Sequence, residues 1–220
     1  VIMNLFEGID MFKVKEMFDI VSNKARTEIQ SLYETECCGE RNYIKKTFFD
    51  PNPSGGERRD GFFNPKIHRE ISDGKNLKLL FPCSVCGESS KYFEESDWEK
   101  LISIDMLDTT RFPNDEYIVN SRINITESTG ANYYGKIFTT RNKVALLILQ
   151  DAISSLPRSK EKDFLQHVMV SSLKLARVAM YGSSTDILYH VVLEKAQESN
   201  VWELFNTQYI NFKKFKEEFY

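Results

Sequence analysis

The sequence has no long run of apolar residues. Even Val144–Leu149 is bounded by Lys143 and Gln150, far short of the roughly 20 apolar residues that cross a bilayer. We therefore expect no membrane span. From Val1 onward the chain also shows no basic segment followed by an apolar one, so we expect no secretory signal.

Glycine and histidine are also sparse. The ten glycines are too scattered to form a dinucleotide-binding fingerprint or a phosphate-binding loop. Of the three histidines, His167 and His190 fall within amphipathic segments, which favours structural roles over a Ser-His-Asp or Cys-His catalytic site. A free-standing enzyme is therefore the weakest interpretation.

Basic charge is not in overall excess, since the formal net charge is -3. It is nevertheless segregated: residues 40–80 carry +3 and residues 111–143 carry +2, whereas the intervening residues 81–110 carry -5. The two basic stretches could contact a polyanion, or they could be solvated surface.

The four cysteines form two close groups, which favours a metal site or free thiols over a disulfide framework. The sequence Cys83-Ser-Val-Cys86-Gly87 is typical of a zinc knuckle, because two intervening residues let both thiolates reach one ion. The neighbours Cys37 and Cys38 are expected to project in different directions, so the fourth ligand would be the neighbouring thiol or His68. The alternatives are a bound zinc ion and reduced, partly buried cysteines.

Hydrophobic periodicity predicts an α+β fold with a helix-rich body and a small strand and zinc-ribbon-like subdomain. We expect an N-terminal helix in 1–35, the strand and cysteine-knuckle subdomain at 36–110, and a helical body with a DNA-reading strand or loop at 111–220. The expected long helices are 10–33, 141–154 (capped by Thr139 or Thr140), 159–181 and 200–219, with a shorter one at 96–106; the expected strands are 43–49, 77–81, 117–125 and 187–193.

Side chains able to bind DNA occur in both basic stretches. Arg58 and Arg59 follow a Pro- and Gly-rich loop and precede Phe62 and Phe63. Arg and Asn can make bidentate contacts with guanine and adenine edges, while Thr and a helix start can hold phosphate. The candidates in the second stretch are Arg111, Asn120, Arg122, Asn124, Lys136, Thr140 and Arg141. Turn, cap and surface-ion roles explain the same residues equally simply.

Five segments, in this order, resemble the region inserted in Zn-ribbon-containing, site-specific adenine DNA methyltransferases of restriction-modification type. They are Leu32-Tyr-Glu-Thr35, Phe81-Pro-Cys-Ser-Val-Cys-Gly87, Asn120-Ser-Arg-Ile-Asn124, Ile137-Phe-Thr-Thr-Arg-Asn142 and Asn200-Val-Trp-Glu-Leu-Phe205. The chain departs from the family at Cys37-Cys38, where the family shows a two-residue gap.

The resemblance implies that this chain is the recognition part of such an enzyme and does not include its catalytic half. In the family, the catalytic domain binds S-adenosylmethionine and carries an Asp/Asn-Pro-Pro-Tyr/Phe motif, but no two prolines of this chain are adjacent. The implied function is target recognition on double-stranded DNA for a methyltransferase domain elsewhere in the parent, in a prokaryotic cytoplasm and with a restriction endonuclease as a further partner. The alternative is a protein-interaction module, stabilised by the knuckle, whose aromatic last helix docks a partner or simply packs in the core.

Overall fold

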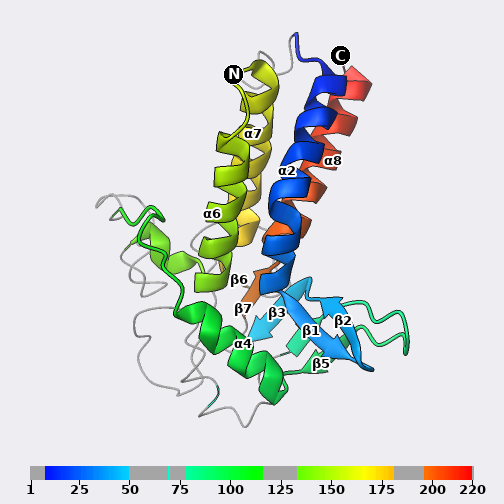
Figure 1. The fold of residues 1–220 in the computed structure, drawn as a ribbon, viewed down its shortest axis with the longest axis vertical. Helices are drawn as coiled ribbons and strands as arrows, with labels where there is room; N and C mark the ends of the chain where they lie inside the picture. The colour runs from blue at the N-terminus through cyan, green and yellow to red at the C-terminus, as the bar shows by residue number, and fades with distance from the viewer. Residues whose placement is uncertain (1–7, 50–68, 70–77, 116–132, 181–195, 220) are drawn as a thin grey trace.

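The computed structural model describes residues 8–49, 69, 78–115, 133–180 and 196–219. Four long helices stand side by side over a small antiparallel sheet and a separate hairpin, which confirms the predicted α+β class (Figure 1). The long helices are α2 (Met11–Leu32), α6 (Thr140–Ser154), α7 (Lys160–Ala176) and α8 (Val201–Phe219). No helix of the described ranges is both long and apolar enough to span a membrane.

The strands lie at the end of the bundle where α2 finishes and α8 starts (Figure 1). The sheet has the order β5-β4-β3-β7-β6, with every neighbouring pair antiparallel, and β1 pairs with β2 in a hairpin of its own. The remaining elements are β1 (Glu34–Cys37), β2 (Glu40–Tyr43), β3 (Lys46–Phe49), β4 (Lys78–Leu80), β5 (Ser90–Tyr92), α4 (Glu95–Asp105), the 3₁₀ helix η1 (Tyr134–Ile137), β6 (Ala179–Met180) and β7 (Ala196–Ser199).

Side-chain caps define where three of the long helices begin. The Asp10 carboxylate accepts the first free N–H groups of α2, from Phe12 at 2.9 Å and Lys13 at 3.4 Å. Thr139 caps α6 by accepting from the N–H of Asn142 at 3.1 Å, and Asn200 accepts from the N–H of Trp202 at 2.9 Å. The predicted starts at Asp10, Thr139 and Asn200 are therefore confirmed.

Two predicted boundaries are wrong. The helix predicted for 159–181 ends at Ala176, because Arg177 is extended and the N–H of Val178 bonds to the carbonyl of Ile137 at 2.8 Å, which leads into β6. The strand predicted for 43–49 is divided between β2 and β3. The predicted strands 117–125 and 187–193 lie outside the described residues.

The helices share one hydrophobic core with the sheet. The aromatic side chains in the first half of α8 are part of it: Trp202 and Phe205 are buried, and Tyr209 stacks on Phe18 of α2 with ring centroids 3.9 Å apart, whereas Phe215 near the end of the helix is 41% exposed. The rings of Trp202, Phe205 and Tyr209 are core contacts, so they do not form a free face for a partner. The simpler interpretation of the aromatic last helix is the one that the packing supports.

A buried polar junction joins the bundle to the sheet. The hydroxyl of Tyr33 donates to the Asn142 amide oxygen at 2.6 Å and accepts from the N–H of Val201 at 3.4 Å. The Asn142 amide in turn donates to the carbonyl groups of Ala176 at 2.6 Å and Ser199 at 3.1 Å. Burial raises the pKa of Tyr33, so its hydroxyl stays protonated and acts as the donor. Segments far apart in sequence are thus held at one point.

Candidate metal centre

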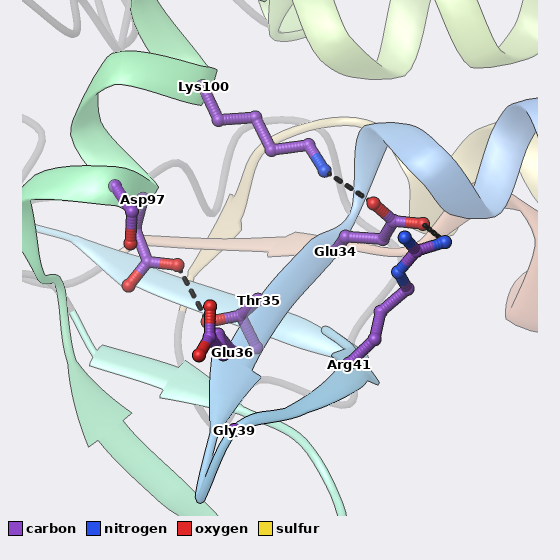
Figure 2. A pocket seen from close by; sticks show the side chains of 8 residues that line it. Glu34, Thr35, Glu36, Gly39, Arg41, Asp97 and Lys100 are labelled. Carbon is purple, nitrogen blue, oxygen red and sulfur yellow. Dashed lines mark hydrogen bonds and ion pairs between the residues drawn. The ribbon is translucent and has the colours of Figure 1, made fainter.

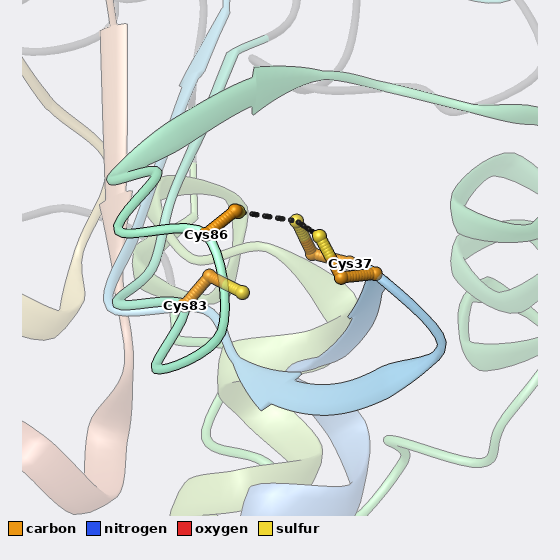
Figure 3. Close-up of side chains that lie close together, drawn as sticks. Cys37, Cys83 and Cys86 are labelled. Atoms are coloured by element: carbon orange, nitrogen blue, oxygen red, sulfur yellow. Dashed lines mark hydrogen bonds between the residues drawn. The ribbon is translucent and has the colours of Figure 1, made fainter.

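The four cysteines converge on one point at the tip of the hairpin. Their sulfur atoms all lie within 4.8 Å of one another, although Cys37 and Cys38 are more than 40 residues before Cys83 and Cys86 in the chain. Figure 3 shows the hairpin thiols facing the thiols of the turn after β4. The Sγ of Cys37 is 3.7 Å from that of Cys86 and 3.9 Å from that of Cys38.

The hairpin turn explains how two adjacent cysteines reach one site. β1 and β2 are joined by Cys38 and Gly39 alone, and both have positive φ, at 56° and 73°. Such a pair forms the type I′ turn that suits a two-residue hairpin, usually with Asn-Gly. Positive φ is sterically unfavourable for a cysteine, but it turns the Cys38 side chain toward the cluster. Of the two candidates for the fourth ligand, the neighbouring thiol is therefore the one that the structure brings to the site, and the four predicted cysteines converge although Cys37 and Cys38 were expected to project in different directions.

The second pair lies in a tight knuckle. The N–H of Gly87 donates to the carbonyl of Cys83 at 3.1 Å, and Gly87 has a φ of 76°, which only glycine adopts without strain. Backbone N–H groups of Cys86 and Val85 lower the pKa of the Cys83 thiol to about 7. The pKa of Cys37 rises to about 12 because of burial first and of the neighbouring thiols next. Four thiolates could not coexist here without a cation.

The donor set fits a tetrahedral metal ion. A Zn–S bond of about 2.3 Å implies sulfur atoms about 3.8 Å apart at the corners of a tetrahedron. Cys37 lies 3.9 and 3.7 Å from Cys38 and Cys86, close to this value, and all four sulfur atoms lie within 4.8 Å of one another. The four cysteines can therefore hold a metal ion by themselves. His68, the alternative ligand, lies outside the described residues.

Buried contacts with α4 fix the hairpin that carries Cys37 and Cys38. The Thr35 hydroxyl donates to the Asp97 carboxylate at 2.6 Å, and both side chains are buried (Figure 2). Lys91 of β5 reaches Asp97 at 3.0 Å and the carbonyl of Glu36 at 2.8 Å. Partial burial disfavours the charge on Lys91, but the carboxylates of Glu94 and Asp97 outweigh it, so the pKa of Lys91 is raised. The cysteine turn thus sits on a rigid support.

A polar cavity of about 400 Å³ lies beside this support. Three of its charges form ion pairs within the wall, since the Glu34 carboxylate lies 3.0 Å from the Lys100 ammonium and 3.2 Å from the Arg41 guanidinium (Figure 2). The lining consists of Glu34, Thr35, Glu36, Gly39, Arg41, Ser96, Asp97 and Lys100. The lining therefore carries three carboxylates and two cations next to the hairpin.

Replacing Thr35 with valine is expected to lower the free energy of unfolding by about 1–3 kcal/mol, because the buried Asp97 carboxylate loses a donor. Urea denaturation measures the change. Thr27→Val on the exposed side of α2 is the matched control and is expected to leave stability close to that of the wild type. Equal effects of the two substitutions would show that the Thr35 contact does not support the hairpin.

Three of the predicted DNA contacts are engaged within the protein. Arg111 is exposed and pairs with both carboxylate oxygens of Asp151, at 3.0 and 2.6 Å. Lys136 lies 5.5 Å from the centre of the Tyr133 ring. The Thr140 hydroxyl donates to Asp105 at 2.7 Å. The predicted contacts Arg58, Arg59, Asn120, Arg122 and Asn124 lie outside the described residues.

Arg141 is not available to DNA in this structure, and its prediction as a base or phosphate contact is corrected. Its side chain is 4% exposed and is paired with the Glu198 carboxylate. It also donates to the Thr47 hydroxyl at 2.8 Å and lies 4.8 Å from the centre of the Tyr33 ring. Burial opposes its charge, but Glu198 outweighs this effect and raises the pKa of Arg141. Arg141 is part of the buried polar junction.

Sequence reasoning missed two buried carboxylates. Asp97 supports the hairpin that carries Cys37 and Cys38, and Glu198 pairs with Arg141. A signal for Asp97 was present, because Glu94-Glu-Ser-Asp97 has the spacing of a reciprocal helix cap, and both capping bonds are formed. The partners of Glu198 come from distant segments, so no local pattern indicates them.

Comparison of the chain with protein-family models, curated proteins and solved structures finds no match.

Proposed function

We propose that this chain is the DNA-binding, target-recognition portion of an adenine-specific DNA methyltransferase, with a structural zinc ion held by Cys37, Cys38, Cys83 and Cys86. The catalytic, S-adenosylmethionine-binding half belongs to another part of the parent. Zinc would supply cohesion between the hairpin and the knuckle, and no reaction step.

Convergence of the cysteines is the observation that carries the proposal. The resemblance pairs a Cys-Gly after the first helix with the knuckle Cys83–Gly87, and these two parts meet in space despite the altered spacing at Cys37-Cys38. The type I′ turn brings both adjacent thiols to the site. The departure from the family spacing therefore leaves four sulfur donors.

The motif segments also meet in the core. Tyr33, Asn142 and Val201 come from three of the five segments that carry the resemblance, and they share hydrogen bonds at the buried polar junction. A role in packing the fold would explain why these three segments resemble the family. The DNA contacts would then come from the chain between them. The Asn120–Asn124 segment lies outside the described residues.

One connection that carries predicted contacts joins two neighbouring strands of the sheet. The chain between Phe49 and Lys78 contains Arg58 and Arg59, and its two ends are adjacent because Phe48 pairs with Lys78.

Duplex binding tests the proposal. We expect log K for a duplex pool to fall linearly with log salt, by about 0.9 for each phosphate contacted. Arg122→Gln is expected to lower discrimination between the selected site and a random duplex by about 1–3 kcal/mol, whereas Arg158→Gln, an exposed arginine between α6 and α7, leaves discrimination unchanged. A chain without duplex binding at low salt, or methyl transfer by the chain alone, would refute the proposal.

A further inference from the structure

The five-stranded sheet has two faces of opposite character. One face carries Thr47, Leu79 and Glu198, which pair across β3, β4 and β7 and are buried. Arg141 of α6 contacts Thr47 and Glu198 on this face. Strand alternation places their sequence neighbours on the other face. That second face is called the open face because three of its residues, Lys46, Lys78 and Tyr92, are exposed. On β3, β4 and β5 it also carries the half-buried Phe48, Leu80 and Ser90, and on β7 it carries Gln197 and the buried Ser199.

The open face combines cations with an exposed ring. Tyr92 is opposite Lys78, and Lys78 is opposite Phe48 in the next strand, so the three form one row across β5, β4 and β3. Tyr92 is 58% exposed, and both Lys46 and Lys78 are exposed. Within the described strands no carboxylate shares this face. Its charge is therefore complementary to a polyanion.

The row has a spacing suited to nucleic acid. Adjacent strands lie about 4.8 Å apart, so a lysine stands next to the Tyr92 ring, and the second lysine is one row away, opposite Leu80. An exposed ring can stack on an unpaired base while nearby ammonium groups neutralise phosphates. In a duplex the faces of the bases are already covered by their neighbours, so the ring favours a single strand.

We propose that the open face binds a single-stranded segment of DNA, with Lys46 and Lys78 on the phosphates and Tyr92 stacked on a base. The identity of the ligand as DNA rests on the proposed function. None of these three residues was predicted as a contact from the sequence.

Fluorescence anisotropy with a labelled thymidine oligomer tests this proposal. Lys46→Gln combined with Lys78→Gln is expected to reduce the salt dependence of log K by about 1.4, because each phosphate contact on a single strand contributes about 0.7. Tyr92→Ala is expected to weaken binding roughly tenfold. On an oligomer with the same phosphates but without bases, Tyr92→Ala is expected to have no effect.

The chain offers matched controls at the other end of the bundle. Lys13 lies in the first turn of α2 and Lys214 near the end of α8, and these helix ends lie away from the sheet in Figure 1. Lys13→Gln with Lys214→Gln removes the same charge, and Phe12→Ala removes a ring that is 70% exposed. Both controls are expected to leave binding of the oligomer nearly unchanged.

The outcomes separate this inference from the proposed function. Equal losses in the sheet and control variants, or no binding of the oligomer by the wild type, overturn the inference. Duplex binding that persists in that case leaves the proposed function standing. Binding of the oligomer with the expected effects, but no duplex binding, supports the open face and refutes the proposed function.

Discussion

Substituting Cys86 with serine is expected to abolish zinc binding and to lower the melting temperature of the zinc-loaded chain by on the order of 10 °C. The physical reason is that the hairpin and the knuckle have little apolar surface of their own at this point. Cys38, Cys86 and Val85 are exposed, and the sulfur cluster is the contact that closes the two turns onto each other. A structural zinc site contributes directly to folding free energy.

The loss of structure in Cys86→Ser should be confined to the hairpin and the knuckle. The long helices α2, α6, α7 and α8 supply most of the core residues, and the turn residues Cys38 and Gly39 are exposed, so helical circular dichroism at room temperature is expected to be nearly unchanged. Protease digestion is instead expected to become faster within residues 34–49 and 78–92. Treating the wild type with a strong chelator should reproduce both effects, and added zinc should reverse them.

Metal analysis and thermal melts measure this prediction. Ser84→Ala, in the same turn but with an exposed side chain that is not a sulfur donor, is the matched control and should retain one zinc per chain. Cys38→Ser should lose zinc as Cys86→Ser does, because the positive φ of Cys38 directs its thiol to the cluster. A wild-type chain purified from zinc-rich medium without zinc would contradict the assignment.

The parts of the fold that sequence predicts well are those set by local chemistry. The helices α2 and α6 have apolar side chains at helical spacing and an Asp or Thr cap, and both begin where those signals indicate. The hairpin β1–β2 was missed because its strands are only four residues long and its turn is Cys-Gly, whose signal is weaker than that of Asn-Gly. The tertiary sulfur contacts select a turn that local preference alone would not.

The candidate site shows the same division. The knuckle at Cys83 and Cys86 was predictable because its spacing is local, whereas the direction of the Cys37 and Cys38 thiols depends on a backbone conformation. Arg141 was misassigned for a related reason: a cation in the first turn of a helix looks like a phosphate contact, and its buried partner Glu198 is 57 residues later in the chain. Contacts between residues far apart in the sequence therefore determine both the direction of the cysteine thiols and the burial of Arg141.

Neutralising Glu198 by substitution with glutamine is expected to lower the free energy of unfolding by about 3–5 kcal/mol, because it leaves the buried guanidinium of Arg141 without its counter-charge. Glu198 is 3% exposed and also accepts the Thr139 hydroxyl that caps α6. The loss therefore reaches the start of a core helix. Urea denaturation of the purified chain measures it.

Removing both charges separates the ion pair from ordinary packing. The double variant Arg141→Met with Glu198→Met is expected to lose at least about 2 kcal/mol less stability than the sum of the two single variants, because each single variant leaves an uncompensated charge in the core and the double variant leaves none. The exposed pair Arg111–Asp151 is the control, because it also joins a guanidinium to a carboxylate and has one member, Asp151, on α6, but it is surrounded by water. A double-mutant cycle of Arg111→Met and Asp151→Asn should show no resolvable coupling energy. Equal coupling in the two cycles would mean that Arg141 and Glu198 are solvated, and Arg141 would then return to the set of candidate DNA contacts.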